Sequence, residues 1–253
     1  MTKRIIFFII IPALVSLRLI LSAICALFVT SNVYAWANTP EISVVKFPTP
    51  PSDCFNINAY CSKTDIVYDG STRYIQVTLF ASIDESAFSN ADALTEHYLN
   101  FDRWAEFLQG RESIRMVRSK TISAVYENKH PKLITQFDHY YGEAPFPFWS
   151  TEIKEVVAYR QLSPSPIEDS EVAYEYELVK GQHDFPEFGE KFMDAVGVKN
   201  KYGRMFIKLD KDNNRYLSYS VTQVTPSIDI LPSIAAPYIE KIVVTIFESV
   251  FNL

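Results

Sequence analysis

Glycine, histidine and basic residues are scarce in this chain of 253 residues. There are 7 Gly and 4 His, and the 24 Lys and Arg are outnumbered by 30 Asp and Glu, a formal net charge of -6. The sequence contains no glycine-rich phosphate loop, G-x-S-x-G elbow, H-E-x-x-H helix or C-x-x-C pair. It also lacks the basic excess that a nucleic-acid surface requires. These absences argue against phosphate-loop proteins, serine hydrolases, zinc proteases and nucleic-acid binders.

Aromatic residues are abundant instead, with 18 Phe and 15 Tyr in a chain that is 48% hydrophobic. Such a composition is apolar enough to fold, and it excludes disorder, collagen and coiled coil. A chain rich in aromatics and poor in glycine suits the lining of an apolar cavity. The four histidines show no spacing typical of metal ligands, so we expect neither a metal nor a cofactor.

Residues 1–37 have the pattern of a secretory signal peptide. Two basic residues precede an apolar stretch, which ends in small-residue motifs that allow cleavage after Ala35 or Ala37. The alternative is an uncleaved N-terminal membrane anchor, because the apolar stretch is long enough to span a bilayer. Arg18 near its middle would be costly there and favours cleavage. The sequence therefore predicts export, to a periplasm or out of the cell.

Residues 38–72 form a proline-rich lead-in that contains Cys54 and Cys61. An even pair of cysteines in an exported chain is most simply a disulfide. Metal binding is the minor alternative, because no histidine or further cysteine lies nearby in the sequence. We expect this bridge to close a short local loop.

Residues 73–253 have the pattern of one α+β domain. Alternating apolar residues predict a strand from Tyr74, and helical spacing follows from Ile83 to Gly110. Further strands are predicted at 113–126, 132–141, 149–162, 172–180, 204–209 and 216–223, with the insertion 182–203 as a candidate gate. An apolar stripe from Ile239 onward predicts a long C-terminal helix that packs on an antiparallel sheet.

This order of elements resembles the helix-grip fold of the START / Bet v 1-like (SRPBCC) superfamily, in which a curved antiparallel sheet wraps around a long C-terminal helix. Phe101–Phe107 is similar to the family's helix after the first strand, and Trp149–Val157 to a central strand. Val221–Pro226 and Ile230–Pro232 resemble the proline-marked turn before the last helix. The resemblance covers about residues 74–253. It implies an apolar cavity for a lipid, sterol or other hydrophobic ligand, while a minority of members are enzymes such as cyclases.

Polar residues on the apolar faces of strands are candidate ligand contacts, because an unpaired buried charge is costly. By strand parity these are Arg118, His139 and Glu155. A one-residue bulge would instead point these side chains toward the solvent, and that alternative stays open. With the aromatic and aliphatic residues of the same faces, the predicted ligand-binding set is Arg118, Phe137, His139, Trp149, Ile153, Glu155, Tyr174, Tyr176, Met205, Ile207, Tyr219, Ile239, Val243 and Phe247.

The sequence thus predicts an exported START-like domain that binds or carries a lipid or other hydrophobic small molecule between its sheet and its C-terminal helix. Transient contact with a membrane is compatible with this role, and nucleic acid is not an expected partner. One alternative is an enzyme on the same fold, cyclase- or hydrolase-like, with Glu155 or His139 as the general acid or base. Another is a protein-interaction domain with a filled core.

Overall fold

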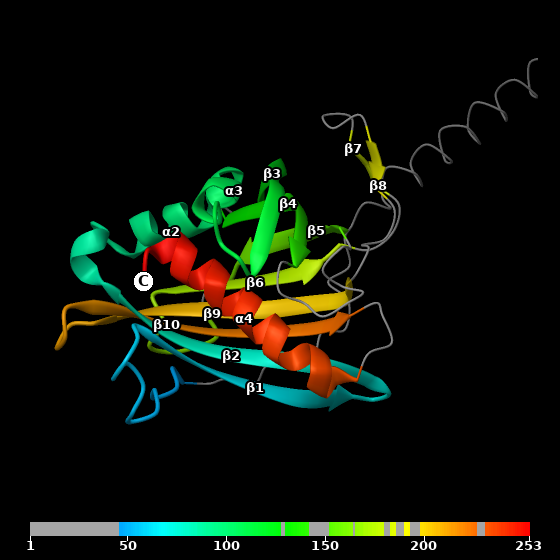
Figure 1. Ribbon diagram of the computed structural model, residues 1–253. Helices are drawn as coiled ribbons and strands as arrows, with labels where there is room; N and C mark the ends of the chain where they lie inside the picture. The colour runs from blue at the N-terminus through cyan, green and yellow to red at the C-terminus, as the bar shows by residue number, and fades with distance from the viewer. Residues whose placement is uncertain are drawn as a thin grey trace, which may run out of the picture. The chain divides into compact units, whose positions relative to one another are not determined.

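A computed structural model gives the fold of the unit Pro40–Leu253 (Figure 1). It describes residues 46–127, 130–141, 152–163, 165–179, 183–185, 190–192, 198–226 and 231–253. The predicted signal peptide, residues 1–37, lies outside the described residues.

The described elements are mainly strands. They are β1 (Tyr60–Asp69), β2 (Thr72–Asp84), β3 (Ile114–Glu127), β4 (His130–Tyr141), β5 (Glu152–Gln161), β6 (Val172–Leu178), β7 (His183–Phe185), β8 (Glu190–Phe192), β9 (Val198–Asp210) and β10 (Arg215–Pro226). The helical elements are η1 (Glu85–Ala87), α2 (Ala91–Leu99), η2 (Phe101–Arg103), α3 (Trp104–Phe107) and α4 (Pro232–Phe251).

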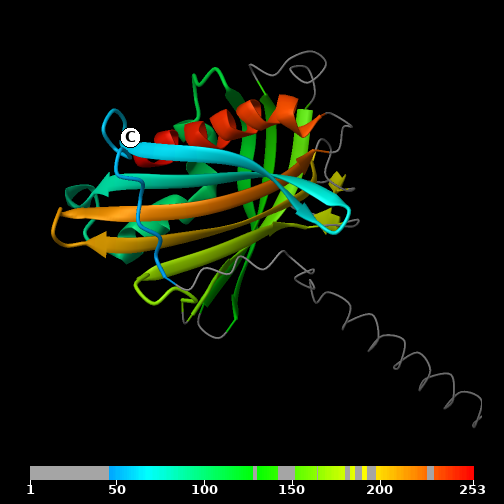
Figure 2. The same ribbon diagram turned by 90° about the horizontal axis from the view of Figure 1, so that it is seen from below.

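Eight strands form one antiparallel sheet in the order β1-β2-β10-β9-β6-β5-β4-β3, and β7 pairs with β8 separately. The sheet is curved, and α4 lies across its concave, inner face (Figures 1 and 2). The predicted helix-grip fold is confirmed. Part of the candidate gate 182–203 belongs to the paired strands β7 and β8, and its end belongs to β9, while residues 182, 186–189 and 193–197 lie outside the described residues.

Strand β2 shows why the sequence folds onto one side of the sheet. Ile75, Val77, Leu79, Ala81 and Ile83 are at most 1% exposed, and they alternate with residues on the outer face. Side chains of a strand point alternately to opposite faces, so this period buries every second residue against α4. The strand continues to Asp84, and the helical segment therefore begins later than predicted, at Glu85.

Helix α4 begins at Pro232, which occupies a first-turn position where a missing N–H costs nothing. It ends at Phe251 and is capped by Asn252, which has a left-handed backbone with φ 54° and donates its backbone N–H to the Glu248 carbonyl. Along one face Ile239, Ile242 and Phe247 are buried against the sheet. Among the described residues, no helix has the length and apolarity needed to cross a membrane.

Helix α2 closes one end of the space between the sheet and α4. The side chain of Asn90 accepts a hydrogen bond from the Ala93 N–H at 2.8 Å and so caps the helix. At the other end of α2, His97 Nε2 lies 2.6 Å from the Val250 carbonyl oxygen, which requires a protonated Nε2. This bond fixes α2 to the last turn of α4.

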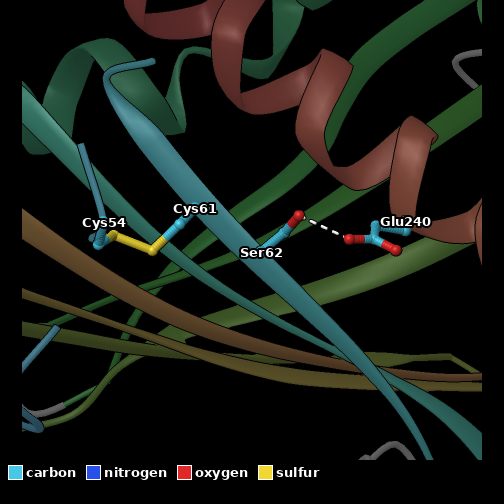
Figure 3. The surroundings of a disulfide bond; sticks show 4 residues. All are labelled: Cys54, Cys61, Ser62 and Glu240. Atoms are coloured by element: carbon cyan, nitrogen blue, oxygen red, sulfur yellow. Dashed lines mark hydrogen bonds between the residues drawn. A yellow bond between two sulfur atoms is a disulfide. The ribbon is translucent and has the colours of Figure 1, made fainter. Parts of the chain in front are cut away.

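The lead-in segment contributes more to the fold than the sequence suggested. The predicted disulfide between Cys54 and Cys61 is confirmed, with Cα atoms 5.4 Å apart (Figure 3). Cys61 lies in β1, which is an edge strand of the sheet. The sequence analysis had assigned this strand to the lead-in. Next to Cys61, Ser62 donates a 2.6 Å hydrogen bond to Glu240 of α4 (Figure 3). The disulfide and this hydrogen bond hold the start of β1 from two sides.

Candidate ligand-binding site

A cavity of about 80 Å³ lies between the inner face of the sheet and α4. Its floor comes from strands β3, β4, β5, β6, β9 and β10, its roof from α4, and its closed end from Tyr98 and Trp104. The Trp104 indole donates a 3.0 Å hydrogen bond to the Tyr98 carbonyl, and the Tyr98 ring stacks on Phe251 with centroids 5.8 Å apart. These contacts fix the aromatic wall at this end.

A partly buried ion pair lies in the lining of this mainly apolar cavity. Lys201 Nζ is 2.6 Å from Glu155 Oε1, and the two side chains are 20% and 3% exposed. The Lys201 ammonium also lies 5.9 Å from the centre of the Phe137 ring. The second carboxylate oxygen of Glu155 has no hydrogen-bond partner among the described residues. Because a buried polar atom without a partner is costly, this oxygen is ready to accept a hydrogen bond from a ligand.

His139 lines the cavity beside this pair and is 4% exposed. Burial lowers the pKa of its imidazole from 6.5 to about 4, and the positive charge of Lys201 acts in the same direction. The negative charge of Glu155 raises the pKa; its effect is weaker than that of burial but stronger than that of Lys201. At neutral pH the imidazole is therefore uncharged, and the charges at the site are those of Glu155 and Lys201.

Tyr176 reaches across strand β9 at Gly203. These two residues are register partners, and a side chain at 203 would overlap the Tyr176 ring. The missing side chain lets the ring lie on the β9 backbone, where its hydroxyl hydrogen-bonds with Thr222 of β10. Burial raises the pKa of the Tyr176 phenol, as it does for Tyr159, so both hydroxyls keep their protons. Tyr176 thus forms a fixed part of the cavity floor.

Eight of the fourteen predicted ligand-binding residues line this cavity. They are Phe137, His139, Glu155, Tyr176, Met205, Ile239, Val243 and Phe247. Three others, Ile153, Tyr174 and Ile207, are buried in the core but are not part of the cavity lining. Trp149 lies outside the described residues.

Two predicted ligand contacts, Arg118 and Tyr219, face the other side of the sheet. The β3–β4 register shifts between Met116 and Arg118, so Arg118 is paired with Asp138, with Nε 3.4 Å from Oδ2, and is 39% exposed. The bulge that the parity argument left open is therefore present. Tyr219 packs on the outer face against Phe206 and Phe47, with ring centroids 6.2 and 6.3 Å away.

The lead-in segment covers these outer aromatic side chains. Residues 46–59 (blue in Figure 2) cross the outer face, and Phe47 joins the apolar group that contains Ile167 and Phe206. The sequence analysis placed Tyr219 of β10 on the inner face of the sheet. In the structure its neighbours Ser220 and Thr222 line the cavity, and Tyr219 does not.

Lys201 is a charged residue of the cavity lining that the sequence analysis did not predict. It was assigned to the insertion 182–203, whereas β9 already begins at Val198. Continuing the alternation of Met205 and Ile207 backwards through Gly203 would have placed Lys201 on the inner face. Glu155 was predicted to need a partner, and Lys201 is that partner.

Neither a protein-family model nor a curated protein matches this chain. Among solved structures it is similar to an aromatase/cyclase from Streptomyces sp. R1128, at 10% identity and a TM-score of 0.43, over 70% of this chain and 91% of the other. A START superfamily protein from Mycobacterium smegmatis has the same identity, TM-score and coverage of this chain, with 94% of its own length covered. Human STARD10 is 8% identical with a TM-score of 0.45, over 75% of this chain and 73% of its own.

The architecture is a helix-grip fold, with a curved antiparallel sheet around a long C-terminal helix. The assignment rests on the strand order and on the position of α4 across the inner face. Within the described ranges, no three or more His, Cys, Asp or Glu side chains are grouped so that they could hold a metal ion. The chemistry available at the site is therefore an apolar enclosure with one ion pair, a neutral imidazole and several hydroxyl groups.

Proposed function

We propose that this protein binds an uncharged, mainly apolar small molecule in the cavity between its sheet and α4. The observation that carries the proposal is the Glu155–Lys201 pair, which faces an apolar enclosure and keeps one carboxylate oxygen unpaired. A ligand hydroxyl would hydrogen-bond with that oxygen, and a ligand carbonyl would accept from the ammonium of Lys201. Apolar contacts would supply most of the affinity and this pair the orientation.

The charges of the site favour a neutral ligand. Glu155 and Lys201 neutralise each other, and His139 is uncharged at neutral pH. A ligand carboxylate would lie close to Glu155, and a ligand ammonium close to Lys201. Either arrangement would bury an uncompensated charge, which is costly in a low-dielectric interior.

The size of the cavity favours a compact ligand. A cavity of about 80 Å³ is smaller than the roughly 300 Å³ at which typical ligand pockets begin. A single ring would fit after small side-chain shifts, whereas a lipid chain would have to displace α4 residues such as Val243 and Ile246. Both are only partly buried, so this part of the lining is the easiest to move.

Native mass spectrometry of protein purified from its source without detergent tests the proposal. We expect one bound small molecule per chain, and loss of that molecule in Val243→Trp, which fills the cavity from α4. The matched control is Val117→Trp, at a position of β3 that is 51% exposed. A protein that is always empty, and that also fails to bind ring alcohols, fatty acids, phospholipids and sterols, would show the proposal to be wrong.

The small cavity volume also favours a second candidate function, that of a protein-interaction domain with a filled core. On this view the Glu155–Lys201 pair is structural and the acidic surface of the chain contacts a partner. Val243→Trp would then leave the binding of the protein partner unchanged, because no ligand has to enter the cavity.

We further propose that the protein is exported. The disulfide Cys54–Cys61 supports this, because such bonds persist in oxidising compartments. N-terminal sequencing of the native protein tests it: we expect a start after Ala35 or Ala37, and an intact Met1 in a membrane fraction would support the anchor instead.

A further inference from the structure

We propose that Lys201 is a covalent binding site for an apolar aldehyde or ketone, which it holds as a protonated imine with Glu155 as the counterion. This inference rests on the proposed function, since the carbonyl compound must first enter the same cavity. It goes further by assigning a bond-forming role to Lys201 and a chemical class to the ligand.

The position of Lys201 is unusual for a lysine. Lys201 lines the cavity and its side chain is 20% exposed, whereas the side chains of Lys63 and Lys208 are 74% and 36% exposed. Lysine amines are nucleophiles toward carbonyl carbons when a neighbouring base takes their proton. Glu155 is such a base, because its Oε1 already accepts a hydrogen bond from Nζ at 2.6 Å. The nucleophile and its proton acceptor are thus in place.

The reaction needs no reagent beyond the carbonyl compound. Lys201 hands one ammonium proton to Glu155, and the neutral amine attacks the carbonyl carbon to form a carbinolamine. Glu155 then returns the proton to the carbinolamine hydroxyl, which leaves as water while the C=N bond forms. The products are a positively charged iminium at Lys201, a carboxylate at Glu155 and one water molecule.

The charge of the site is the same before and after this step. An ammonium beside a carboxylate becomes an iminium beside the same carboxylate, so no uncompensated charge is buried. The unpaired second oxygen of Glu155 lies free to bond with the carbinolamine hydroxyl before water leaves.

Borohydride trapping with benzaldehyde tests the proposal, because the probe is a single apolar ring with one carbonyl. The purified protein is incubated with benzaldehyde near neutral pH, reduced and digested, and the peptides are mapped by mass spectrometry. We expect one saturable label on Lys201, with a mass gain of the aldehyde plus two hydrogens minus one water. Benzyl alcohol, which fits the same cavity but cannot condense, should compete with the labelling.

Lys201→Arg should reduce this labelling by roughly tenfold or more, because a guanidinium keeps its charge beside Glu155 and does not act as an amine nucleophile. The matched control is Lys208→Arg, on the same strand but paired at the surface with Asp169, and it should keep the label. Circular dichroism confirms that both variants are folded. If Lys201→Arg does not fold, the peptide map of the unaltered protein tests the proposal instead: a label on Lys201 supports it, and a label only on other lysines refutes it.

Three results would overturn the proposal in distinguishable ways. If the extent of labelling increased with the exposed fraction of each lysine, and Lys201 were among the least labelled, the site would not activate the Lys201 amine. Benzyl alcohol binding without any label on Lys201 would refute the imine and leave the proposed binding function standing. Failure of both probes to bind would count against the imine and the proposed function together.

Discussion

Lowering the pH should destabilise this protein through His139. Burial holds the pKa of this imidazole at about 4 in the folded state, against 6.5 for the unperturbed group. Between these two values the unfolded chain binds a proton that the folded protein does not. The free energy of unfolding therefore falls as the pH drops from 6.5 toward 4, by at most about 1.4 kcal/mol per unit. Over the whole window the loss amounts to about 3 kcal/mol, and above pH 6.5 the contribution of His139 is constant.

Urea unfolding of the protein and of His139→Gln, at about pH 7.5 and about pH 4.5, measures this contribution. Acidic groups whose pKa is lowered in the folded state, such as Asp84 and Asp210, also weaken the fold in acid. They do so equally in both proteins, so the difference between the two pH dependences isolates His139. The unaltered protein should lose about 2–3 kcal/mol more than the variant. An equal loss in both proteins would refute the claim that the imidazole is held neutral by burial.

Three further predictions concern stability. Gly203→Ala should cost about 1–3 kcal/mol by urea unfolding, because the new methyl displaces the Tyr176 ring, and the cost should largely vanish in a Tyr176→Ala background. Replacing Cys54 and Cys61 by alanine should lower the free energy of unfolding by about 2 kcal/mol, a value expected for so short a loop; no change in thermal midpoint would contradict it. Asn90→Ala should cost about 1 kcal/mol through the lost cap of α2, and Asn90→Asp should restore it.

The strands with clean alternation were predicted closely from the sequence. For β6, where Tyr and Glu alternate, the prediction was 172–180 and the structure has Val172–Leu178. The bounds of β3 were also close, 113–126 against Ile114–Glu127, although bulges break its alternation. Strand β1 was missed because most of its residues are polar or only half-buried, as suits an edge strand. Its place in the sheet depends on pairing with β2 and on contacts with α4, and neither is a property of the local sequence.

The candidate site was predicted where strand parity held and missed where it failed. Glu155 and His139 follow from an unbroken alternation in β5 and β4. Arg118 was misplaced by a bulge, whose extra residue leaves no mark on the composition of the strand. Lys201 was missed because its strand begins inside a segment that had no clear period.

The strand order determines when the β1–β2 hairpin can join the rest of the sheet during folding. β2 does not pair with the strand that follows it in the sequence but with β10, near the end of the chain. The β1–β2 hairpin, with the apolar row from Ile75 to Ile83, therefore stays unsatisfied until nearly the whole polypeptide is available. Contacts so distant in sequence slow folding and leave apolar strands open to aggregation in the meantime. The disulfide and the hydrogen bond to Glu240 therefore secure a hairpin whose second strand finds its other neighbour only late in synthesis.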